Sequence, residues 1–268
     1  MQAPPNLFKQ RLLAGTPQIG LWGALSSPYV TELLASVGYD WLLIDNEHAP
    51  NDVRSTLAQL QAVAPYPVQP VVRLVEGQVP LVKQHLDIGA QNLLIPMVET
   101  VEQAQLMVSA VRYPPRGIRG VGSALARASR WNQIDGYLQN ADRNICLMLQ
   151  VESVAGLNNL EAIAAVDGVD GVFFGPGDLS ASMGLIGQQD HPQVVAAISA
   201  GIQAVKRAGK APGMLSANPQ RAKEYLAQGA SFVAVGSDTT LLVRAAKELL
   251  QSFKPGAAKA APAPTGAY

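Results

Sequence analysis

The sequence contains one cysteine, has no excess of either charge and has no long apolar run. Its 268 residues include 20 Lys and Arg against 20 Asp and Glu. The lone Cys146 cannot form an internal disulfide and reads as a buried, inert thiol, which suits a reducing compartment. The balanced charge gives no indication of a basic surface that would bind nucleic acid or an anionic membrane. No window approaches the roughly 20 apolar residues of a spanning helix, and residues 1–13 have no apolar core of signal-peptide length. We therefore expect a soluble, cytoplasmic protein.

Several motifs that carry chemistry elsewhere are missing too. No G-x-G-x-x-G follows an apolar run and no G-x-x-x-x-G-K-[ST] occurs, which disfavours dinucleotide and P-loop folds. The lysines all fall on predicted helices, at their ends or in the termini (Lys9, Lys83, Lys206, Lys210, Lys223, Lys247, Lys254 and Lys259). A Schiff-base lysine would have to stand at the end of a strand. Imine catalysis is therefore disfavoured, and a bound metal ion is the expected electron sink.

Eight short apolar runs alternate with eight helix-like segments along the chain. The runs are nearly continuous, which is typical of parallel strands buried on both faces. They cover residues 19–25, 41–45, 69–74, 93–98, 145–152, 169–174, 212–217 and 232–236. The helical segments cover residues 28–37, 52–64, 79–88, 100–112, 155–166, 193–208, 219–228 and 239–252. This count favours a single-domain (β/α)₈ TIM barrel over residues 1–253 rather than an open doubly wound sheet.

Two segments depart from this rhythm. Residues 113–144 form a connection far longer than usual, with a short helix predicted at 134–141. Since it leaves the end of a helix, it belongs to the N-terminal face of the barrel, where long ordered loops commonly serve assembly. Residues 254–268, rich in Ala, Pro and Gly, are predicted to form a flexible tail.

Polar residues gather where the predicted strands end, which is where barrel enzymes place their chemistry. They are Asp45, Glu47, His48, Arg73, Gln150, Glu152, Asp178, Asn218 and Asp238. Gln150 and Glu152 are two apart on one strand and so share a face. Glu152 and Asp178 end successive strands and should converge. Two carboxylates without a thiolate or imidazole suit a hard divalent cation.

His48 stands out among the three histidines because two carboxylates, Asp45 and Glu47, lie near it in sequence. A carboxylate bonded to one ring nitrogen fixes the tautomer and raises basicity, as a proton-transfer role requires. We expect a catalytic role for His48 and structural roles for His85, in a helix, and His191, in a loop.

Several motifs, in order, resemble the HpcH/HpaI aldolase family. They are 42–50 (LLIDNEHAP), Arg73, 113–122 (YPPRGIRGVG), 150–152 (QVE), 175–180 (GPGDLS) and 232–236 (FVAVG). The likeness covers about residues 8–254, with Asn46 where the family has Gly and Gly177 where it has Ala. It implies a class II, metal-dependent pyruvate aldolase. Such an enzyme reversibly cleaves a 4-hydroxy-2-oxo acid, such as 4-hydroxy-2-oxoheptanedioate from aromatic catabolism, to pyruvate and an aldehyde such as succinate semialdehyde.

The resemblance also implies roles for individual residues. Glu152 and Asp178 would bind Mg²⁺, Mn²⁺ or Co²⁺, with pyruvate completing the shell. Gln150, Asp178 and the backbone at Gly177 would hold the substrate, and Arg73 would neutralise the developing enolate oxygen. His48 would move the proton of the aldol hydroxyl, with Asp45 orienting the network.

Three further assignments concern the aldehyde pocket and a neighbouring subunit. Trp22 and Leu215 are candidates for the wall of the aldehyde pocket. The family gives Asp87 the task of making the histidine more basic, yet Asp87 should lie at the opposite rim from His48. We therefore expect Asp87 and Val121 to act across a subunit interface. The resemblance implies a homohexamer, a trimer of dimers.

Three alternatives remain open from the sequence. The substrate could be a 2-keto-3-deoxy sugar acid of the rhamnonate or glucarate type. A lyase acting on acyl-CoA or phosphoenolpyruvate would need more basic groups than Arg73 at this rim. A binding barrel without catalysis is the third.

Overall fold

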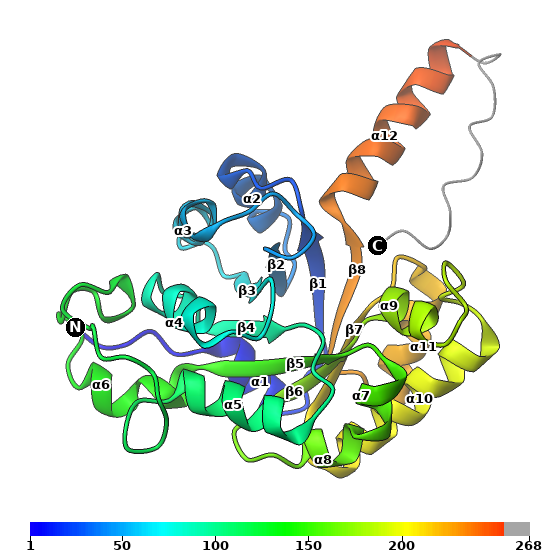
Figure 1. Cartoon of the computed structure of the whole chain (residues 1–268). Helices are drawn as coiled ribbons and strands as arrows, with labels where there is room; N and C mark the ends of the chain where they lie inside the picture. Colours follow the sequence, from blue (N-terminus) through cyan, green and yellow to red (C-terminus); the bar gives the residue numbers. More distant parts are fainter. Residues whose placement is uncertain (255–268) are drawn as a thin grey trace.

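A closed barrel of eight parallel strands forms the body of the protein in the computed structural model, which describes residues 1–254 (Figure 1). Each strand pairs with its neighbours in sequence, and the last strand closes on the first. The strands are β1 (Gln18–Gly23), β2 (Trp41–Asp45), β3 (Gln69–Arg73), β4 (Asn92–Ile95), β5 (Cys146–Val151), β6 (Gly171–Phe174), β7 (Ala211–Leu215) and β8 (Phe232–Ser237). The predicted (β/α)₈ barrel is confirmed. Of the predicted tail, all but Lys254 lies outside the described residues.

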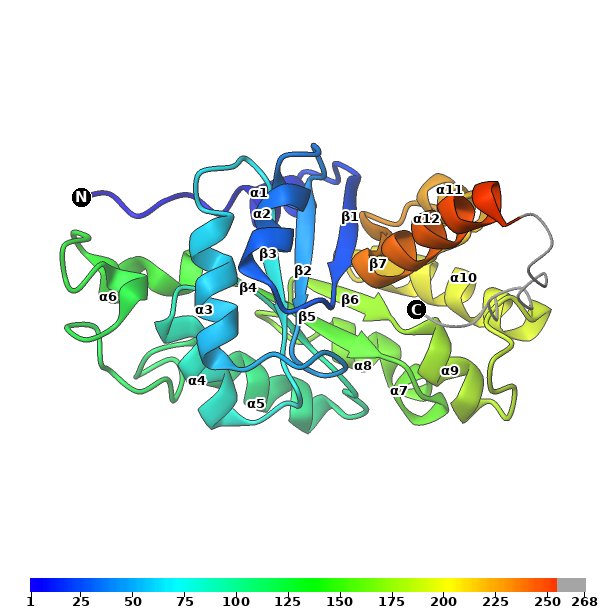
Figure 2. The same ribbon diagram turned by 90° about the horizontal axis from the view of Figure 1, so that it is seen from above.

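Helices connect the strands on the outside of the barrel, except for α1, which precedes β1, and α12, which follows β8 (Figures 1 and 2). They are α1 (Leu7–Leu13), α2 (Pro28–Ala35), α3 (Val53–Ala62), α4 (Val79–Asp87), α5 (Val101–Val111), α6 (Tyr137–Asn140), α7 (Val154–Asn158), α8 (Leu160–Ala164), α9 (Pro176–Ser182), α10 (Pro192–Arg207), α11 (Pro219–Gln228) and α12 (Asp238–Phe253). None of these helices, within residues 1–254, combines the length and apolar character that crossing a bilayer requires.

Two helices are not among the predicted helical segments, α1 before β1 and α9 directly after Gly175. Several predicted elements also differ in extent. The predicted helix 155–166 is divided into α7 and α8 at Asn159, whose backbone leaves the helical region. The predicted strand 93–98 ends at Ile95, since Met97 turns into the left-handed region with φ 53°.

The strands are continuous apolar runs because their side chains are buried on both faces, inside the barrel and against the helices. Cys146 and Met148 point into an inner cluster, whereas Leu147 and Leu149 pack outward against the helices. Burial raises the pKa of the Cys146 thiol well above its usual value, so the expected inert thiol agrees with its surroundings. From α1, Phe8 enters the inner cluster and closes the N-terminal end, with its ring 5.8 Å from that of Phe232.

The long connection between α5 and β5 is ordered and lies at the N-terminal end of the barrel. It contains α6 and two 3₁₀ helices, Arg127–Ser129 and Ala141–Asn144, so the helix predicted at 134–141 is shorter than expected. Both views place α6 near the N-terminus of the chain (Figures 1 and 2). Arg127 anchors this connection to α4 by donating to the carbonyl oxygen of Ile88 at 2.8 Å.

The last helix, α12, leaves the body of the molecule instead of packing along the barrel (Figure 1). Every residue from 242 to 253 is exposed. The exposed set includes the apolar side chains Leu242, Val243, Leu249, Leu250 and Phe253. A 16-residue helix with so much uncovered apolar surface is typical of an element that packs against another molecule.

Candidate active site

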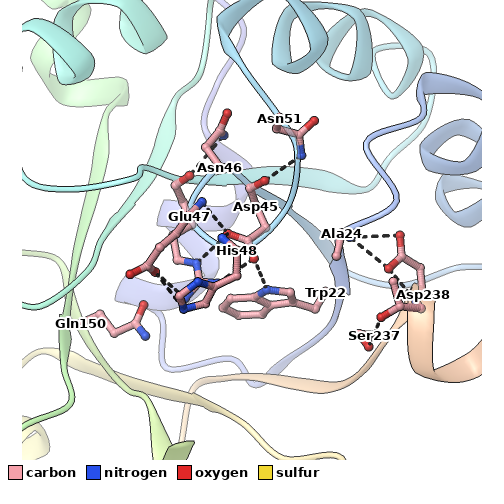
Figure 3. A network of polar contacts seen from close by, with 12 residues as sticks. Trp22, Ala24, Asp45, Asn46, Glu47, His48, Asn51, Gln150, Ser237 and Asp238 are labelled. Carbon is pink, nitrogen blue, oxygen red and sulfur yellow. Dashed lines mark hydrogen bonds and ion pairs between the residues drawn. The ribbon is translucent and has the colours of Figure 1, made fainter. Parts of the chain in front are cut away.

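The ends of β2 and β3 bring Asp45 and Arg73 side by side as register partners. Arg73 donates from Nε and Nη2 to the two carboxylate oxygens of Asp45, at 2.8 and 2.6 Å. The indole Nε1 of Trp22 donates to the same carboxylate at 3.1 Å (Figure 3). Burial alone would raise the pKa of Asp45, but the contacts from Arg73 outweigh it and leave that pKa lowered. Asp45 is therefore a fixed anion that holds Arg73 in place.

Glu47 and His48 follow in the loop after β2 (Figure 3). Glu47 Oε2 lies 2.7 Å from Arg73 Nη1 and 3.9 Å from His48 Nε2. The carboxylate expected beside the His48 ring is thus Glu47, since Asp45 accepts from the backbone N–H of His48 at 3.4 Å instead. Burial raises the pKa of Glu47, although the charges of Arg73 and His48 oppose that rise.

Glu152 is buried at the end of β5 and has two close donors. The backbone N–H of Met97 reaches Oε1 at 3.0 Å, and the Gln150 amide contacts Oε2. Gln150 and Glu152 therefore share a face, as their spacing predicts. Burial raises the pKa of Glu152 to about 7, and the charges of Asp178 and Glu47 add to that rise. The site thus holds a carboxyl group whose ionised form lacks a compensating positive charge.

Two further residues of the site follow β6 in the chain, Gly175 directly after the strand and Asp178 in α9. Phe174 is the register partner of Val151, so Gly175 comes opposite Glu152. A Cβ at Gly175 would overlap the carboxylate of Glu152, so a larger residue at this position would have to displace the Glu152 side chain. Asp178 lies in the first turn of α9. Its charge raises the pKa of both Glu152 and Glu47, so the three carboxylates lie near one another.

These side chains fit a hard divalent cation. Within residues 1–254 no group of three or more His, Cys, Asp and Glu side chains is arranged to hold a metal ion, so a cation at this site would need oxygen ligands besides Glu152 and Asp178. Glu152 and Asp178 offer carboxylate oxygens, and the buried Oε1 of Gln150 has no hydrogen-bond partner. Mg²⁺ and similar ions accept oxygen ligands and keep positions for water or substrate oxygens. A cation would also relieve the repulsion that raises the pKa of Glu152.

A cavity of about 60 Å³ opens beside this cluster at the C-terminal end of the barrel. Trp22 and Leu215 form part of its wall, as predicted, together with Arg73, Gln150, Gly177 and Asp178. Sequence reasoning missed Gln189, Arg221 and Tyr225, which also line it. They come from a loop and from α11 rather than from strand ends, and no sequence signal places them at the rim.

Two of the strand-end residues have structural contacts. Asn218 caps α11 by accepting from the backbone of Gln220 at 3.0 Å. Asp238 accepts from the backbone N–H groups of Ala24 and Leu25 at 3.0 Å, which ties β8 to the loop after β1 (Figure 3).

The other two histidines also have local contacts. The His85 ring, 3% exposed, lies 2.8 Å from the carbonyl oxygen of Leu81. Burial lowers its pKa. His191 caps α10 by accepting from the backbone of Gln193 at 3.3 Å.

Asp87 and Val121 lie away from the cavity in a single chain. Asp87 ends α4, and its Oδ1 accepts from Arg119 Nη2 at 3.1 Å. Val121 is exposed, on the long connection before β5. Both belong to the N-terminal end of the barrel, as the sequence predicts.

The fold and the site together define a class. A (β/α)₈ barrel whose buried carboxylates, arginine and histidine meet at the C-terminal rim has the architecture of a barrel enzyme for a small oxygen-rich substrate.

The family follows from comparison with known sequences. The sequence profile of "HpcH/HpaI aldolase/citrate lyase" matches residues 18–245, and the chain belongs to this family. It is similar to a hydroxypyruvate/pyruvate aldolase of Paraburkholderia phytofirmans (strain DSM 17436 / LMG 22146 / PsJN), with 63% identity over 268 residues and 100% of each chain covered. It is also similar to a 4-hydroxy-2-oxo-heptane-1,7-dioate aldolase of Klebsiella pneumoniae subsp. pneumoniae, with 59% identity over 248 residues, covering 92% of this chain and 94% of that one. The predicted family and the predicted carbon–carbon lyase activity are confirmed.

Solved structures agree with this assignment. An HpcH/HpaI aldolase/citrate lyase family protein from Burkholderia cenocepacia J2315 superposes with a TM-score of 0.90 and 41% identity. The match covers 93% of this chain and 99% of that chain.

Proposed function

We propose that this enzyme is a metal-dependent pyruvate aldolase that cleaves a 4-hydroxy-2-oxo acid, such as 4-hydroxy-2-oxoheptanedioate, to pyruvate and an aldehyde. The convergence of Glu152 and Asp178 carries this proposal. Two neighbouring carboxylates, one with its pKa raised to about 7, suit a divalent cation and an oxygen-chelating keto acid. The 59% identity to a 4-hydroxy-2-oxo-heptane-1,7-dioate aldolase supports the substrate class.

Glu152 and Asp178 would hold the cation, which when bound supplies positive charge to polarise the keto group of the substrate. Gln150 and the backbone at Gly177 would orient the substrate carboxylate. Arg73 would stabilise the negative charge that develops on the keto oxygen. Three of its nitrogens already contact Asp45 and Glu47, but a guanidinium has five N–H groups, so donors remain for the substrate.

His48 would accept the proton of the aldol hydroxyl during cleavage and return it during synthesis. Its half-exposed side chain stands at the open end of the barrel beside Glu47, where water has access. Glu47 would favour the protonated imidazolium that this transfer produces, since an opposite charge nearby stabilises the charged form. Asp45 would act through Arg73, which it holds with two hydrogen bonds.

A second candidate uses hydroxypyruvate in place of pyruvate as the nucleophile. The relative with 63% identity is named a hydroxypyruvate/pyruvate aldolase. The unpartnered Oε1 of Gln150 could accept a hydrogen bond from the extra hydroxyl group of hydroxypyruvate. A polar partner of this kind lets an enzyme distinguish a hydroxylated substrate from the analogue that lacks the hydroxyl group.

The test is an aldol-cleavage and aldol-synthesis assay with the full chain. Pyruvate release from 4-hydroxy-2-oxoheptanedioate and from rhamnonate- and glucarate-derived keto acids should stop with EDTA and return with Mg²⁺, Mn²⁺ or Co²⁺. Asp178→Asn should abolish the metal-restored activity, whereas the surface change Glu161→Gln should leave it intact. Activity that survives EDTA and Asp178→Asn would overturn the proposal. Comparing pyruvate with hydroxypyruvate in synthesis separates the two candidates.

We further infer that the enzyme assembles with copies of itself, up to the homohexamer that the resemblance implies. The exposed apolar face of α12, with Leu242, Leu249 and Phe253, and the exposed Tyr29 and Leu33 of α2 support this inference. The position of Asp87 at the N-terminal end supports a role for it in the site of a neighbouring copy, with Val121 beside it.

A further inference from the structure

A second, larger cavity of about 590 Å³ lies at the N-terminal end of the barrel, away from the carboxylate cluster. Its walls come from residues 2–7, from the ends of α3 and α4, and from the long connection before β5. Figures 1 and 2 both place the N-terminus near α6 on this side of the molecule. The proposed aldolase chemistry uses none of these walls.

Three arginines, Arg119, Arg127 and Arg130, line this cavity. Arg127 and Arg130 are half-buried, and neither forms an ion pair with a carboxylate within residues 1–254. Both donate to backbone carbonyl oxygens, Arg127 from Nη1 to that of Ile88 at 2.8 Å and Arg130 from Nη1 to that of Arg127 at 3.3 Å. Burial lowers the pKa of Arg127, and the like charge of Arg130 adds to this. Arg127 and Arg130 therefore give the cavity positive charge that no carboxylate among the described residues neutralises.

Arg119 provides an independent sign of a missing partner. The residue is 1% exposed and packs over the Tyr113 ring, with its guanidinium carbon 4.5 Å from the ring centroid. Nη2 donates to Asp87 at 3.1 Å and to the Tyr137 hydroxyl at 3.3 Å, but Nε and Nη1 have no hydrogen-bond partner. Buried guanidinium N–H groups without an acceptor are costly, so an acceptor is the expected occupant. The acidic side chain in the lining, Asp135, is 92% exposed and points to solvent.

Much of the remaining lining is apolar, although Gln2, Gln69, Gln91, Asn140 and Asn144 also contribute to it. Leu60 and Val63 from the end of α3, Leu86 from α4, and Ile134 and Ile145 from the connection are buried residues that face the cavity. A pocket with apolar walls and a few convergent charged groups suits a small molecule with an apolar body and a charged head. Guanidinium groups prefer oxyanions, which they can bind with two parallel hydrogen bonds.

We propose that this cavity is a binding site for a small organic anion, with its carboxylate or phosphate head on Arg127 and Arg130 and its apolar body between α3, α4 and the long connection. The site is distinct from the carboxylate cluster and does not depend on which aldol the enzyme cleaves.

Isothermal titration calorimetry on the full chain tests this site. Saturating Mg²⁺ and pyruvate are present throughout to occupy the rim. Hexanoate and benzoate should bind at one site per chain, with acetate and the neutral benzamide much weaker. Inorganic phosphate is titrated separately, and binding as tight as that of hexanoate would assign the head group to phosphate compounds. The Arg127→Gln/Arg130→Gln double variant should weaken binding by about tenfold or more, since two charge-assisted contacts are lost.

Matched variants keep the result interpretable. Arg54→Gln/Arg244→Gln removes the same charge from the exposed faces of α3 and α12 and should leave the affinity unchanged. Ala64→Trp, at an exposed lining position, should block the cavity while all three arginines remain. The proposal is overturned if no anion binds, if benzamide binds as well as benzoate, or if both lining variants bind like the unchanged protein.

Discussion

Arg73 and Asp45 form a paired, two-point contact at the rim of the barrel, Nε to Oδ1 at 2.8 Å and Nη2 to Oδ2 at 2.6 Å. The strands set this geometry, because the two residues are register partners on β2 and β3. One face of the guanidinium group lies over the Trp22 ring, with the guanidinium carbon 4.8 Å from the ring centroid. Arg73 is thus held by a carboxylate and an indole before any substrate arrives, and preorganised charge of this kind lowers the barrier for reactions that develop an oxyanion.

Arg73→Lys should lower kcat by about a hundredfold, because lysine cannot make the planar two-point contact that fixes the charge. The measurement is steady-state cleavage of the substrate identified by the panel above. Arg207→Lys, in a surface pair with Glu161, is the matched control and should retain full activity. Equal activity in the Arg73 variant would show that the two-point contact is dispensable.

A second prediction separates the two glycines beside the carboxylates. Gly175→Ala should reduce kcat by about a hundredfold or more, because the new Cβ would occupy the space of the Glu152 carboxylate and displace it. Gly177→Ala should be nearly neutral, since its Cβ would meet Gln189 Nε2 at 3.3 Å, the end of a flexible side chain. Circular dichroism establishes that both variants fold. Similar activities for the two variants would show that a Cβ at position 175 does not displace Glu152.

The stability of the metal-free protein should fall as pH rises. The pKa of Glu152 is about 7 in the folded protein, against an ordinary value of 4.5. A carboxyl whose pKa is raised by folding contributes stability that is fully present below pH 4.5 and lost as pH rises through 7. The shift corresponds to about 3 kcal/mol. Urea unfolding in EDTA between pH 4.5 and 7.5 measures this, and the raised pKa of Glu47 acts in the same direction.

Two controls identify the group responsible for this pH dependence. Glu152→Gln should reduce the slope of unfolding free energy against pH and leave the share that comes from Glu47. Adding Mg²⁺ and pyruvate should restore stability above pH 7, because ligand binding to the folded state shifts the equilibrium. A slope that is the same in the variant would assign the effect to other groups.

The apolar face of α12 predicts a change in assembly. Leu249→Asp/Phe253→Asp places charges on exposed apolar positions and should shift the protein to a smaller species. Gln251→Asp/Ser252→Asp adds the same charge to the same helix outside that set and should leave the assembly unchanged. Size-exclusion chromatography with light scattering gives the mass of each species. An unchanged mass for the first variant would exclude α12 from the interface.

Much of the fold could be predicted from the alternation of continuous apolar runs with helical periods. That pattern arises because each strand is packed on both faces, as Cys146 and Leu147 illustrate. The helix α1 could not be found this way, since a single helix of 7 residues that closes the barrel with Phe8 has too few turns to show a period. The sequence also could not predict that α12 projects from the barrel, because its apolar face has the same pattern as the face of a helix that packs on a barrel.

At the site, spacing predicted the shared face of Gln150 and Glu152, whose side chains are in contact. The convergence of Glu152 with Asp178 stays a prediction, which the effect of Asp178 on the pKa of Glu152 supports. The sequence placed two carboxylates near His48, Asp45 and Glu47, and could not say which of them lies beside the ring; it is Glu47. Which carboxylate stands beside the His48 ring depends on the path of the loop after β2, and no propensity encodes that path. The roles in substrate binding and catalysis stay predictions.

The concealed thiol of Cys146 makes this protein convenient for site-directed labelling. It is the one cysteine of the chain, it is 0% exposed and it lies inside the barrel. Maleimide dyes should therefore leave the unchanged protein unlabelled in its native state. A cysteine introduced near the end of α12 would be a unique attachment point, and energy transfer between such dyes would report how the helices of neighbouring copies approach one another.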